Sequence, residues 1–389
     1  MSKENSIFLE HQGDVDSKSN GIIMGLVIIP IILMSLGLIN LYSAADTRGI
    51  FYGQIQNIII SLVLIFAIGW FFPAQKLSSF AFWIYIFTIC ILILVLLFGD
   101  ISNGSRRWIG IGVFRGQPSE LAKITVAIIV AKFFASNRIY SSYRLRDLWP
   151  VALYVGLIFF LIAMQPDLGT AGLCVIIACS QISFMNLNKK SVITAGIATI
   201  IFFIVGWFFL LHDYQKLRIL NFLNPQIDPF GSGYNIQQSL IAVGSGSLFG
   251  KGFLQGSQTQ LEFLPARHTD FILSVFAEEN GFFATLTLIS MYFFLTFLCL
   301  EIARRAKNTF SSLLAIGIAT NLFTQFFINV AMVLGMFPVV GVPLPLFSHG
   351  GSSLITSSIG LGLLIAICRY NHGKIKDRSL TIKNLLKPL

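Results

Sequence analysis

Charged residues are scarce in this chain. Asp, Glu, Lys and Arg make up only 11% of its 389 residues, whereas hydrophobic residues make up 55%. Soluble globular domains carry about 25% charged residues, so this scarcity excludes an ordinary water-soluble domain. The composition instead indicates a protein that crosses a membrane several times.

Cysteine and the common catalytic motifs are also rare or missing. The 5 cysteines all fall within apolar stretches and form no CxxC pair, which is typical of packing residues rather than of disulfides or metal ligands. The chain has no HExxH and no GxSxG, and His212, His268 and His349 are scattered. We therefore expect no transition-metal site made by the protein alone. Neither glycine cluster, at 244–247 or 250–252, follows a predicted strand, which argues against a nucleotide-binding loop.

Long apolar runs are abundant, and they predict the fold class. Each is close to or above the ~20 residues that a helix needs to cross a bilayer. We expect an all-α integral membrane protein with ten transmembrane helices. The ten runs cover residues 21–43, 55–73, 80–98, 119–135, 148–165, 168–187, 191–211, 271–300, 310–337 and 351–369.

The Lys and Arg residues predict the orientation. Most of the 27 lie on one side if both termini and the loops after the second, fourth, sixth and eighth runs face the cytoplasm. This is the positive-inside pattern, so the net charge of +10 reads as a topology signal that needs no nucleic-acid partner. We predict a cytoplasmic tail at 1–20, a transmembrane domain at 21–371 and a basic cytoplasmic tail at 372–389, which also suits contact with anionic lipid.

Two segments predicted on the outer face depart from that charge pattern. The first, 99–118, contains Arg106, Arg107 and Trp108. The second, 212–270, is the only long loop, and a structureless loop of that length would be unusual, so we expect it to be folded. Apolar residues recur at helical spacing over 234–243, which predicts a short helix lying in the membrane interface.

A few charged residues stand inside or beside the apolar runs. Glu120 and Lys123 are three residues apart and share one helical face, which predicts a buried ion pair. The pair serves either as a structural clamp or as a site where Lys123 also reaches a substrate anion. Asp167 lies between two closely spaced runs, where it is placed to cap the next helix by accepting from the amides of Gly169 and Thr170.

Asp270 is the strongest candidate for a catalytic base. It follows Arg267 and His268, and an apolar helix is predicted to begin directly after it. Partial loss of water at such a position raises the pKa of a carboxylate toward the value that a general base needs. The alternative is that Asp270 caps the helix N-terminus, and the two roles are compatible.

Seven segments carry a resemblance to a known family. The chain resembles the SEDS family, the shape, elongation, division and sporulation proteins, from 21 to 371. The C-terminal segment, FPVVGVPLPLFSHGGSS, looks like the rod-shape (RodA) branch rather than the division branch. In two places this chain departs from the family pattern: Ala266 stands where an acidic residue is common, and His349 where Tyr is common. The matching segments are 103–109, 117–123, 165–170, 235–247, 250–253, 260–272 and 337–353.

The resemblance implies a SEDS-type fold with one long extracytoplasmic loop between helices 7 and 8, at 212–270. It also implies a peptidoglycan glycosyltransferase that polymerises lipid II and releases undecaprenyl diphosphate, for cell elongation and rod shape. Asp270 matches the family's essential loop aspartate, and Glu120 and Lys123 match its intramembrane acid–base pair. The implied location is the bacterial cytoplasmic (inner) membrane, with the active site on the outer face. The implied partners are a class B penicillin-binding transpeptidase and the elongation machinery.

The chemistry of that reaction suits the candidate residues. A sugar hydroxyl must lose a proton, for which one carboxylate suffices, and a leaving diphosphate is stabilised by cations. Trp108 suits either stacking under a sugar or an interface belt. A Mg²⁺ ion held between the diphosphate and a carboxylate stays open. We predict substrate contacts from Arg106, Arg107, Trp108, Lys123, Arg267 and His268, and supporting roles for Glu120, Asp167, Glu262 and Ser348.

Two other functions compete with polymerisation. In a lipid II translocase (flippase), Glu120, Lys123 and Asp167 would line a path across the membrane. The clustering of charge at the outer face argues against it. A non-catalytic scaffold for a transpeptidase would leave the charged segment 253–270 unexplained.

Overall fold

The protein was analysed as a computed structural model. It describes residues 3–45, 47–102, 105–111, 114–137, 142–210, 213–223 and 232–385. His212, residues 103–104 of the first matching segment, residues 224–231 of the long loop and residues 386–389 of the basic tail lie outside the described residues.

The apolar runs are helical, and the described residues are mostly helix. By length and composition, eight of the helices could cross a membrane. Of the ten helices that correspond to the predicted apolar runs, two fall outside this group. They are α4, which carries Glu120, Lys123 and Lys132, and α6, which has 16 residues. The helices are α1 Lys3–Ala44, α2 Arg48–Phe71, α3 Ala74–Phe98, α4 Pro118–Ser136, α5 Trp149–Ala163, α6 Leu168–Ser183, α7 Lys189–Val205, α11 Ile272–Arg305, α12 Thr309–Val333 and α13 Gly351–Leu385.

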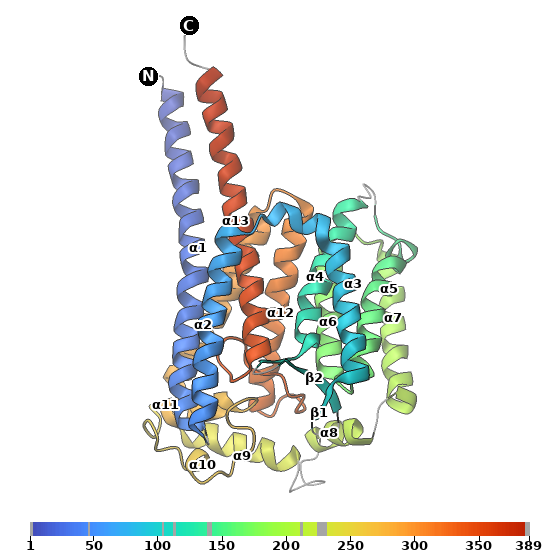
Figure 1. Cartoon of the computed structure of the whole chain (residues 1–389), viewed down its shortest axis with the longest axis vertical. Coiled ribbons are helices and arrows are strands. Elements are labelled where there is room, and N and C mark those ends of the chain that lie inside the picture. The colour runs from blue at the N-terminus through green and yellow to red at the C-terminus, as the bar shows by residue number, and fades with distance from the viewer. Residues whose placement is uncertain are drawn as a thin grey trace.

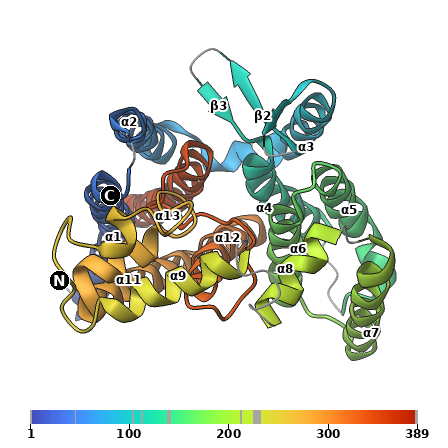
Figure 2. The ribbon, with the colours of Figure 1, turned by 90° about the horizontal axis from the view of Figure 1, so that it is seen from below.

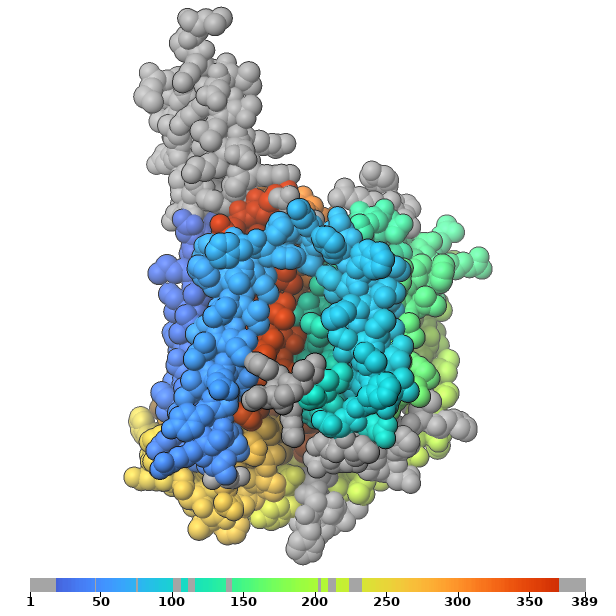
Figure 3. Space-filling view, viewed as in Figure 1, coloured from blue at the N-terminus to red at the C-terminus, as the bar shows by residue number. Residues whose placement is uncertain are grey.

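The helices run roughly parallel in one bundle, with α12 and α13 near its middle (Figures 1 and 2). In their most apolar stretches, 67% of α12 and 78% of the membrane-length part of α13 are buried, against 0% for α7. Figure 2 accordingly shows α7 at the edge of the bundle. On the face seen in Figure 3, α13 is visible between α2 and α3. The predicted tails continue α1 and α13 as helices beyond one end of the bundle (Figure 1).

Local sequence explains where several helices begin. Helix α4 starts at Pro118, where the missing amide hydrogen costs nothing because the first turn has no acceptor for it. The side chain of Asn308 accepts from Ser311 N at 2.7 Å and so caps α12. Turn η1, a 3-10 helix at Leu145–Leu148, leads into α5, and η2, a π-helical turn at Gly206–Leu210, follows α7.

A small antiparallel sheet lies between α3 and α4. Its strands are β1 Asp100–Ser102, β2 Ser105–Ile111 and β3 Phe114–Gly116, in the order β1-β2-β3. This sheet was not predicted from the sequence, whereas the predicted helical fold class agrees with the described residues, which are mostly helix. It places Arg106, Arg107 and Trp108 on the central strand, at the end of the bundle opposite the chain termini (Figure 1).

The long loop is folded wherever the structure describes it. It contains α8 Asp213–Leu223, α9 Ser232–Ser245 and α10 Ser257–Gln260, and α9 confirms the short helix predicted at 234–243. The loop is tied to α11 by Lys251, whose ammonium lies 2.7 Å from the buried Glu278 carboxylate. Helix α11 is interrupted at Gly281, where φ is +76° and glycine avoids the strain that a side chain would bring.

Candidate active site

A cavity of about 670 Å³ lies at the end of the bundle that carries the sheet. It gathers segments that are far apart in the chain: β2, the starts of α4 and α6, helix α8, the residues before α11 and the loop before α13. Polar and charged groups line much of it. The charged and titratable lining residues are Arg107, Glu120, Asp167, Arg218, Asp270 and His349; the others include Trp108, Gln117, Thr170, Gly341, Ser352 and Ser353.

Asp270 lines this cavity and does not cap a helix. The N-cap residue of α11 is Phe271, and it makes no side-chain cap bond, so the capping alternative is wrong. Among the described residues, no hydrogen bond is made to the Asp270 carboxylate, which lies beside Gly341. Burial raises the pKa of Asp270 from 3.8 to about 6, while the nearby Arg218 guanidinium acts to lower it. A half-buried carboxylate with free oxygens and such a pKa is suited to accept a proton near neutral pH.

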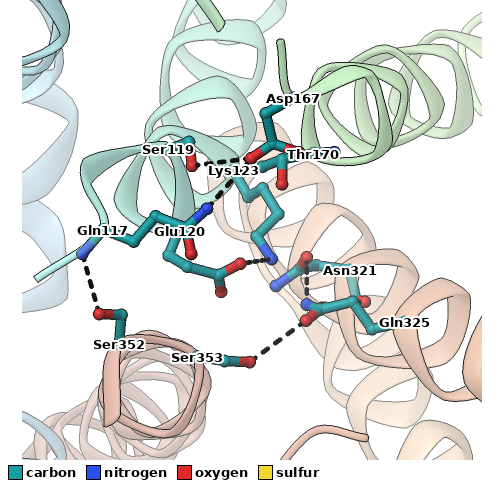
Figure 4. Close-up of polar contacts among 10 residues, drawn as sticks. All are labelled: Gln117, Ser119, Glu120, Lys123, Asp167, Thr170, Asn321, Gln325, Ser352 and Ser353. Carbon is teal, nitrogen blue, oxygen red and sulfur yellow. Dashed lines mark hydrogen bonds and ion pairs between the residues drawn. The ribbon is translucent and has the colours of Figure 1, made fainter. Parts of the chain in front are cut away.

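Glu120 and Lys123 form the predicted ion pair. Lys123 Nζ lies 2.8 Å from Glu120 Oε1, and Lys123 is only 1% exposed (Figure 4). Glu120 lines the cavity, whereas Lys123 lies behind it and is not part of the lining. The second Glu120 oxygen, Oε2, is buried without a partner among the described residues. Of the two residues, Glu120 and not Lys123 is therefore in a position to contact a ligand in the cavity.

Asp167 joins two helices at the wall of the cavity. Its carboxylate caps α6 by accepting from Thr170 N at 3.3 Å, as predicted for Thr170. It also accepts from Gln117 Nε2 at 3.1 Å and from Ser119 Oγ at 3.4 Å, just before and within α4 (Figure 4). These contacts hold the starts of α4 and α6 together and so shape the cavity.

The two neighbouring arginines of β2 have different surroundings. Arg107 lines the cavity beside Trp108, and its guanidinium donates to the carbonyl oxygens of Gln165, at 3.0 Å, and of Pro166. Arg106 is exposed, is not part of the lining and donates to Leu97 O at 3.3 Å. Of this pair, the structure brings only Arg107 to the cavity.

Four further candidates lie next to the cavity rather than on it. Arg267 is 8% exposed and donates to Ala44 O at 3.1 Å, Thr259 O at 2.9 Å and Glu262 Oε1 at 3.0 Å. These bonds assign Arg267 and Glu262 to holding the loop before α11. Ser348 is buried, and its hydroxyl accepts from Leu344 N at 2.9 Å. His268 contributes its backbone carbonyl, which accepts from His349 N at 3.1 Å.

Three residues that the sequence analysis gave no catalytic or binding role belong to this site. Arg218 of α8 lines the cavity and donates to Val339 O at 3.2 Å. Its position in an outer loop against the positive-inside pattern was the available signal. His349 lines the cavity as well. Asn329 of α12 holds the backbone of Asp270, and no sequence signal distinguished it from other polar residues in the helix.

The fold and the cavity together define the class of protein. It is a multi-pass helical membrane protein whose cavity, at one end of the bundle, is lined by the Asp270 carboxylate and by two arginines, Arg107 and Arg218. The chain belongs to the FtsW/RodA/SpoVE family of cell cycle proteins, whose pattern it matches over residues 20–373.

Named relatives cover nearly the whole chain. It is 40% identical over 358 residues to the peptidoglycan glycosyltransferase MrdB of Escherichia coli (strain K12), covering 91% of this chain and 95% of that protein. It is 34% identical over 362 residues to the stage V sporulation protein E of Bacillus subtilis (strain 168), covering 89% and 97%.

Solved structures agree with this assignment. A chain from a structure describing how a peptidoglycan synthase complex coordinates polymerization and crosslinking superimposes with a TM-score of 0.77 at 30% identity, covering 90% of this chain and 98% of that chain. The rod shape determining protein RodA of Thermus thermophilus superimposes with a TM-score of 0.67 at 29% identity, covering 89% and 96%.

Proposed function

We propose that this protein is a peptidoglycan glycosyltransferase that polymerises lipid II for cell elongation and releases undecaprenyl diphosphate. The observation that carries the proposal is the Asp270 carboxylate, which does not cap α11 and lies in a cavity that Arg107 and Arg218 also line. A base and cations in one cavity are what glycosyl transfer from a diphosphate requires. The names of the relatives, MrdB and FtsW glycosyltransferases, support the same reaction.

In the proposed reaction, the 4-hydroxyl of an acceptor sugar attacks the anomeric carbon of the donor. The new bond joins the hydroxyl oxygen to that carbon, and the bond from the carbon to the diphosphate oxygen breaks with its electron pair. Asp270 takes the hydroxyl proton, which its pKa of about 6 allows near neutral pH. The guanidinium groups of Arg107 and Arg218 stabilise the negative charge on the leaving diphosphate, since arginine bonds phosphate oxygens in pairs.

The remaining candidates keep the roles that their surroundings support. Trp108 stacks under a sugar at the cavity wall, which Glu120 also lines. Lys123 holds Glu120 in place through their ion pair, and Asp167 maintains the shape of the wall. His268, Arg267, Glu262 and Ser348 act on the site through the backbone and loops that they hold.

A divalent cation would arrive with the substrate. In the described part of the chain, no group of three or more His, Cys, Asp or Glu side chains is placed to hold a metal ion. Glu120, a carboxylate that lines the cavity, is the residue that would hold a Mg²⁺ ion already bound to diphosphate. Such an ion would add positive charge at the leaving group.

The proposed topology has ten transmembrane helices in the bacterial cytoplasmic membrane. Helices α4 and α6 bring the eight apolar helices to ten. Many of their side chains, including Glu120 and Lys123 of α4, are buried against the rest of the protein. Both termini are then cytoplasmic, and the cavity, at the opposite end of the bundle, opens on the outer face. We propose a class B penicillin-binding transpeptidase as partner, since one of the similar chains comes from a peptidoglycan synthase complex.

Purified protein supplied with labelled lipid II in detergent tests the proposal. Only a polymerase makes glycan chains without a bilayer, whereas a translocase needs two leaflets and a scaffold makes no product. Chains that appear with the parent protein, and not with Asp270→Asn, would support the assignment. A parent protein that makes no chains, with and without added Mg²⁺ and the transpeptidase, would overturn it.

A further inference from the structure

A buried glutamine determines which nitrogen of His349 carries the proton. Gln54 of α2 is 1% exposed, and its Nε2 donates to the backbone carbonyl of Ser348 at 3.2 Å. Its other amide atom, Oε1, therefore faces His349 Nδ1, at 3.1 Å. Because a carboxamide oxygen only accepts hydrogen bonds, Nδ1 must be the donor, and it holds the proton.

The consequence is a free lone pair on the other ring nitrogen. A neutral imidazole has one N–H, so with Nδ1 protonated Nε2 is an acceptor. His349 lines the same cavity as Asp270. In the described part of the chain Nε2 has no hydrogen-bond partner, and it is not among the partnerless atoms that are sealed from solvent. It is thus an acceptor that faces open space in the site.

The imidazole is neutral rather than cationic in this setting. Burial lowers the pKa of His349, and the neighbouring His268 lowers it further. The rings of the two histidines lie 6.3 Å apart between centroids. A neutral acceptor suits a hydroxyl group, whereas a phosphate oxygen requires a donor or a cation, which Arg107 and Arg218 supply elsewhere on the wall.

The backbone fixes His349 relative to Asp270. His349 N donates to the carbonyl of His268, two residues before Asp270, at 3.1 Å. The ring is held by Gln54 from α2 and the backbone by the loop before α11. Both contacts join segments that are distant in sequence, and together they hold the imidazole of His349 and the residues before α11 in a fixed relative position.

We infer that His349 is a further substrate-binding residue, whose Nε2 accepts a hydrogen bond from a sugar hydroxyl, and that Gln54 is its positioning residue. The inference rests on the proposed glycosyltransferase function, which supplies the class of substrate. It assigns His349 to orienting a sugar, and leaves proton removal to Asp270.

Substrate analogues test the bond directly. We would measure kcat/KM for lipid II and for analogues that each lack one sugar hydroxyl other than the attacking one. The parent is expected to use one analogue about three- to tenfold less well, the scale of one uncharged hydrogen bond. His349→Phe, which keeps a ring without nitrogen, should use this analogue and lipid II equally well. His349→Gln, which keeps an acceptor, should restore part of the preference.

Two more variants separate binding from folding. Gln54→Leu removes the acceptor for Nδ1, so the tautomer is no longer set and the preference should shrink while His349 remains. His372→Phe, the same exchange in the cytoplasmic extension of α13, should behave as the parent. If His349→Phe does not elute as folded protein, the loss of preference is tested with Gln54→Leu against the parent, and His349→Gln shows whether another acceptor at this position maintains it.

The outcomes are distinct. Loss of the preference for one hydroxyl in His349→Phe or Gln54→Leu supports the inference. A parent without preference among the analogues, or variants that slow all substrates equally, would overturn it and leave the polymerase assignment intact. A parent that forms no glycan chains would overturn the proposed function, and the inference with it.

Discussion

Asn329 of α12, which is not part of the cavity lining, holds the backbone of Asp270 through its side-chain amide. Its Nδ2 donates to the carbonyl of Asp270 at 2.9 Å and to the carbonyl of Val342 at 2.8 Å. Asn329 is 0% exposed and Val342 is 4% exposed, so water does not readily replace this donor at the Val342 carbonyl. One amide thus ties the proposed base to the neighbouring loop, which also lines the cavity.

Removing that amide should lower activity by displacing Asp270. Asn329→Ala leaves the buried carbonyl of Val342 and the part-buried carbonyl of Asp270 without this donor, and a buried group left unpaired costs on the order of 1–3 kcal/mol. We expect a polymerisation rate at least about tenfold lower, at matched folded concentration. The matched control is Asn137→Ala at the exposed end of α4, where the amide bonds only the nearby Phe133 carbonyl. Equal rates for the two variants would show that Asn329 does not position the base.

Asp270→Asn should abolish most of the activity without a comparable loss of stability. Because Phe271, rather than Asp270, occupies the N-cap, the change removes no capping bond. Loss of a general base typically lowers the rate by ~10²–10⁴. Polymerisation and thermal unfolding in detergent are measured together, with Asp100→Asn, an exposed carboxylate outside the cavity lining, as control. Retention of more than about a tenth of the parent rate would move the base elsewhere.

The rate should rise with pH through the pKa of Asp270. The carboxylate is the active form, and its pKa of about 6 means that protonation removes it as pH falls below that value. We expect kcat/KM to fall about tenfold per pH unit on the acid side. Arg218→Ala removes the cation that lowers this pKa, so the fall of kcat/KM on the acid side should occur at higher pH. If the pH at which kcat/KM falls is the same in Arg218→Ala and in the parent, either Asp270 is not the titrating group or Arg218 does not act on its pKa.

Breaking the Glu120–Lys123 pair should destabilise the protein. Glu120→Gln leaves the ammonium of Lys123 buried and uncompensated, at a cost of roughly 3–5 kcal/mol. The double variant Glu120→Gln, Lys123→Met removes both charges and should recover much of the thermal stability. Activity should stay low in both, because Glu120 is the member that lines the cavity. A single variant as stable as the parent would show that the pair has no clamping role.

Arg107 and Arg106 should differ in their effect on substrate use. Arg107→Ala is expected to raise the KM for lipid II about tenfold or more, since it removes a charged hydrogen-bond donor from the cavity. Arg107→Lys should recover only part, because lysine lacks the planar fork. Arg106→Ala should have the smaller effect, because its side chain is exposed outside the lining. The two alanine variants are compared for KM and for yield of folded protein, and an equal rise in KM would place both arginines on the substrate.

Local patterns predicted the local features correctly. The ten apolar runs are helices, the ion pair at Glu120 and Lys123 forms, and Asp167 caps α6. Each depends on residues within one or two helical turns, whose spacing is visible in the sequence. The short helix α9 follows the same rule.

Predictions that depended on distant partners were less reliable. Asp270 was predicted to be either a helix cap or a base, and the cap was wrong because the first turn of α11 begins one residue later. Arg267 lies three residues before Asp270 in sequence, but its guanidinium contacts Ala44, Thr259 and Glu262 and does not line the cavity. The three-stranded sheet was missed because its strands are short, and strand pairing is not a periodic signal.

The sequence by itself determined that this protein is a helical membrane protein, where its helices lie and that Asp270 stands at a helix edge. Those properties follow from apolar content, charge and spacing along the chain. Only the tertiary structure decided which polar groups meet in the cavity: Arg107 rather than Arg106, Glu120 rather than Lys123, and Arg218 and His349 with Asp270. The contacts of Gln54 with His349 and of Asn329 with Asp270 join residues in different helices and loops, 295 and 59 positions apart. Helix packing, and not local spacing, brings such partners together, so no pattern along the chain could have revealed them.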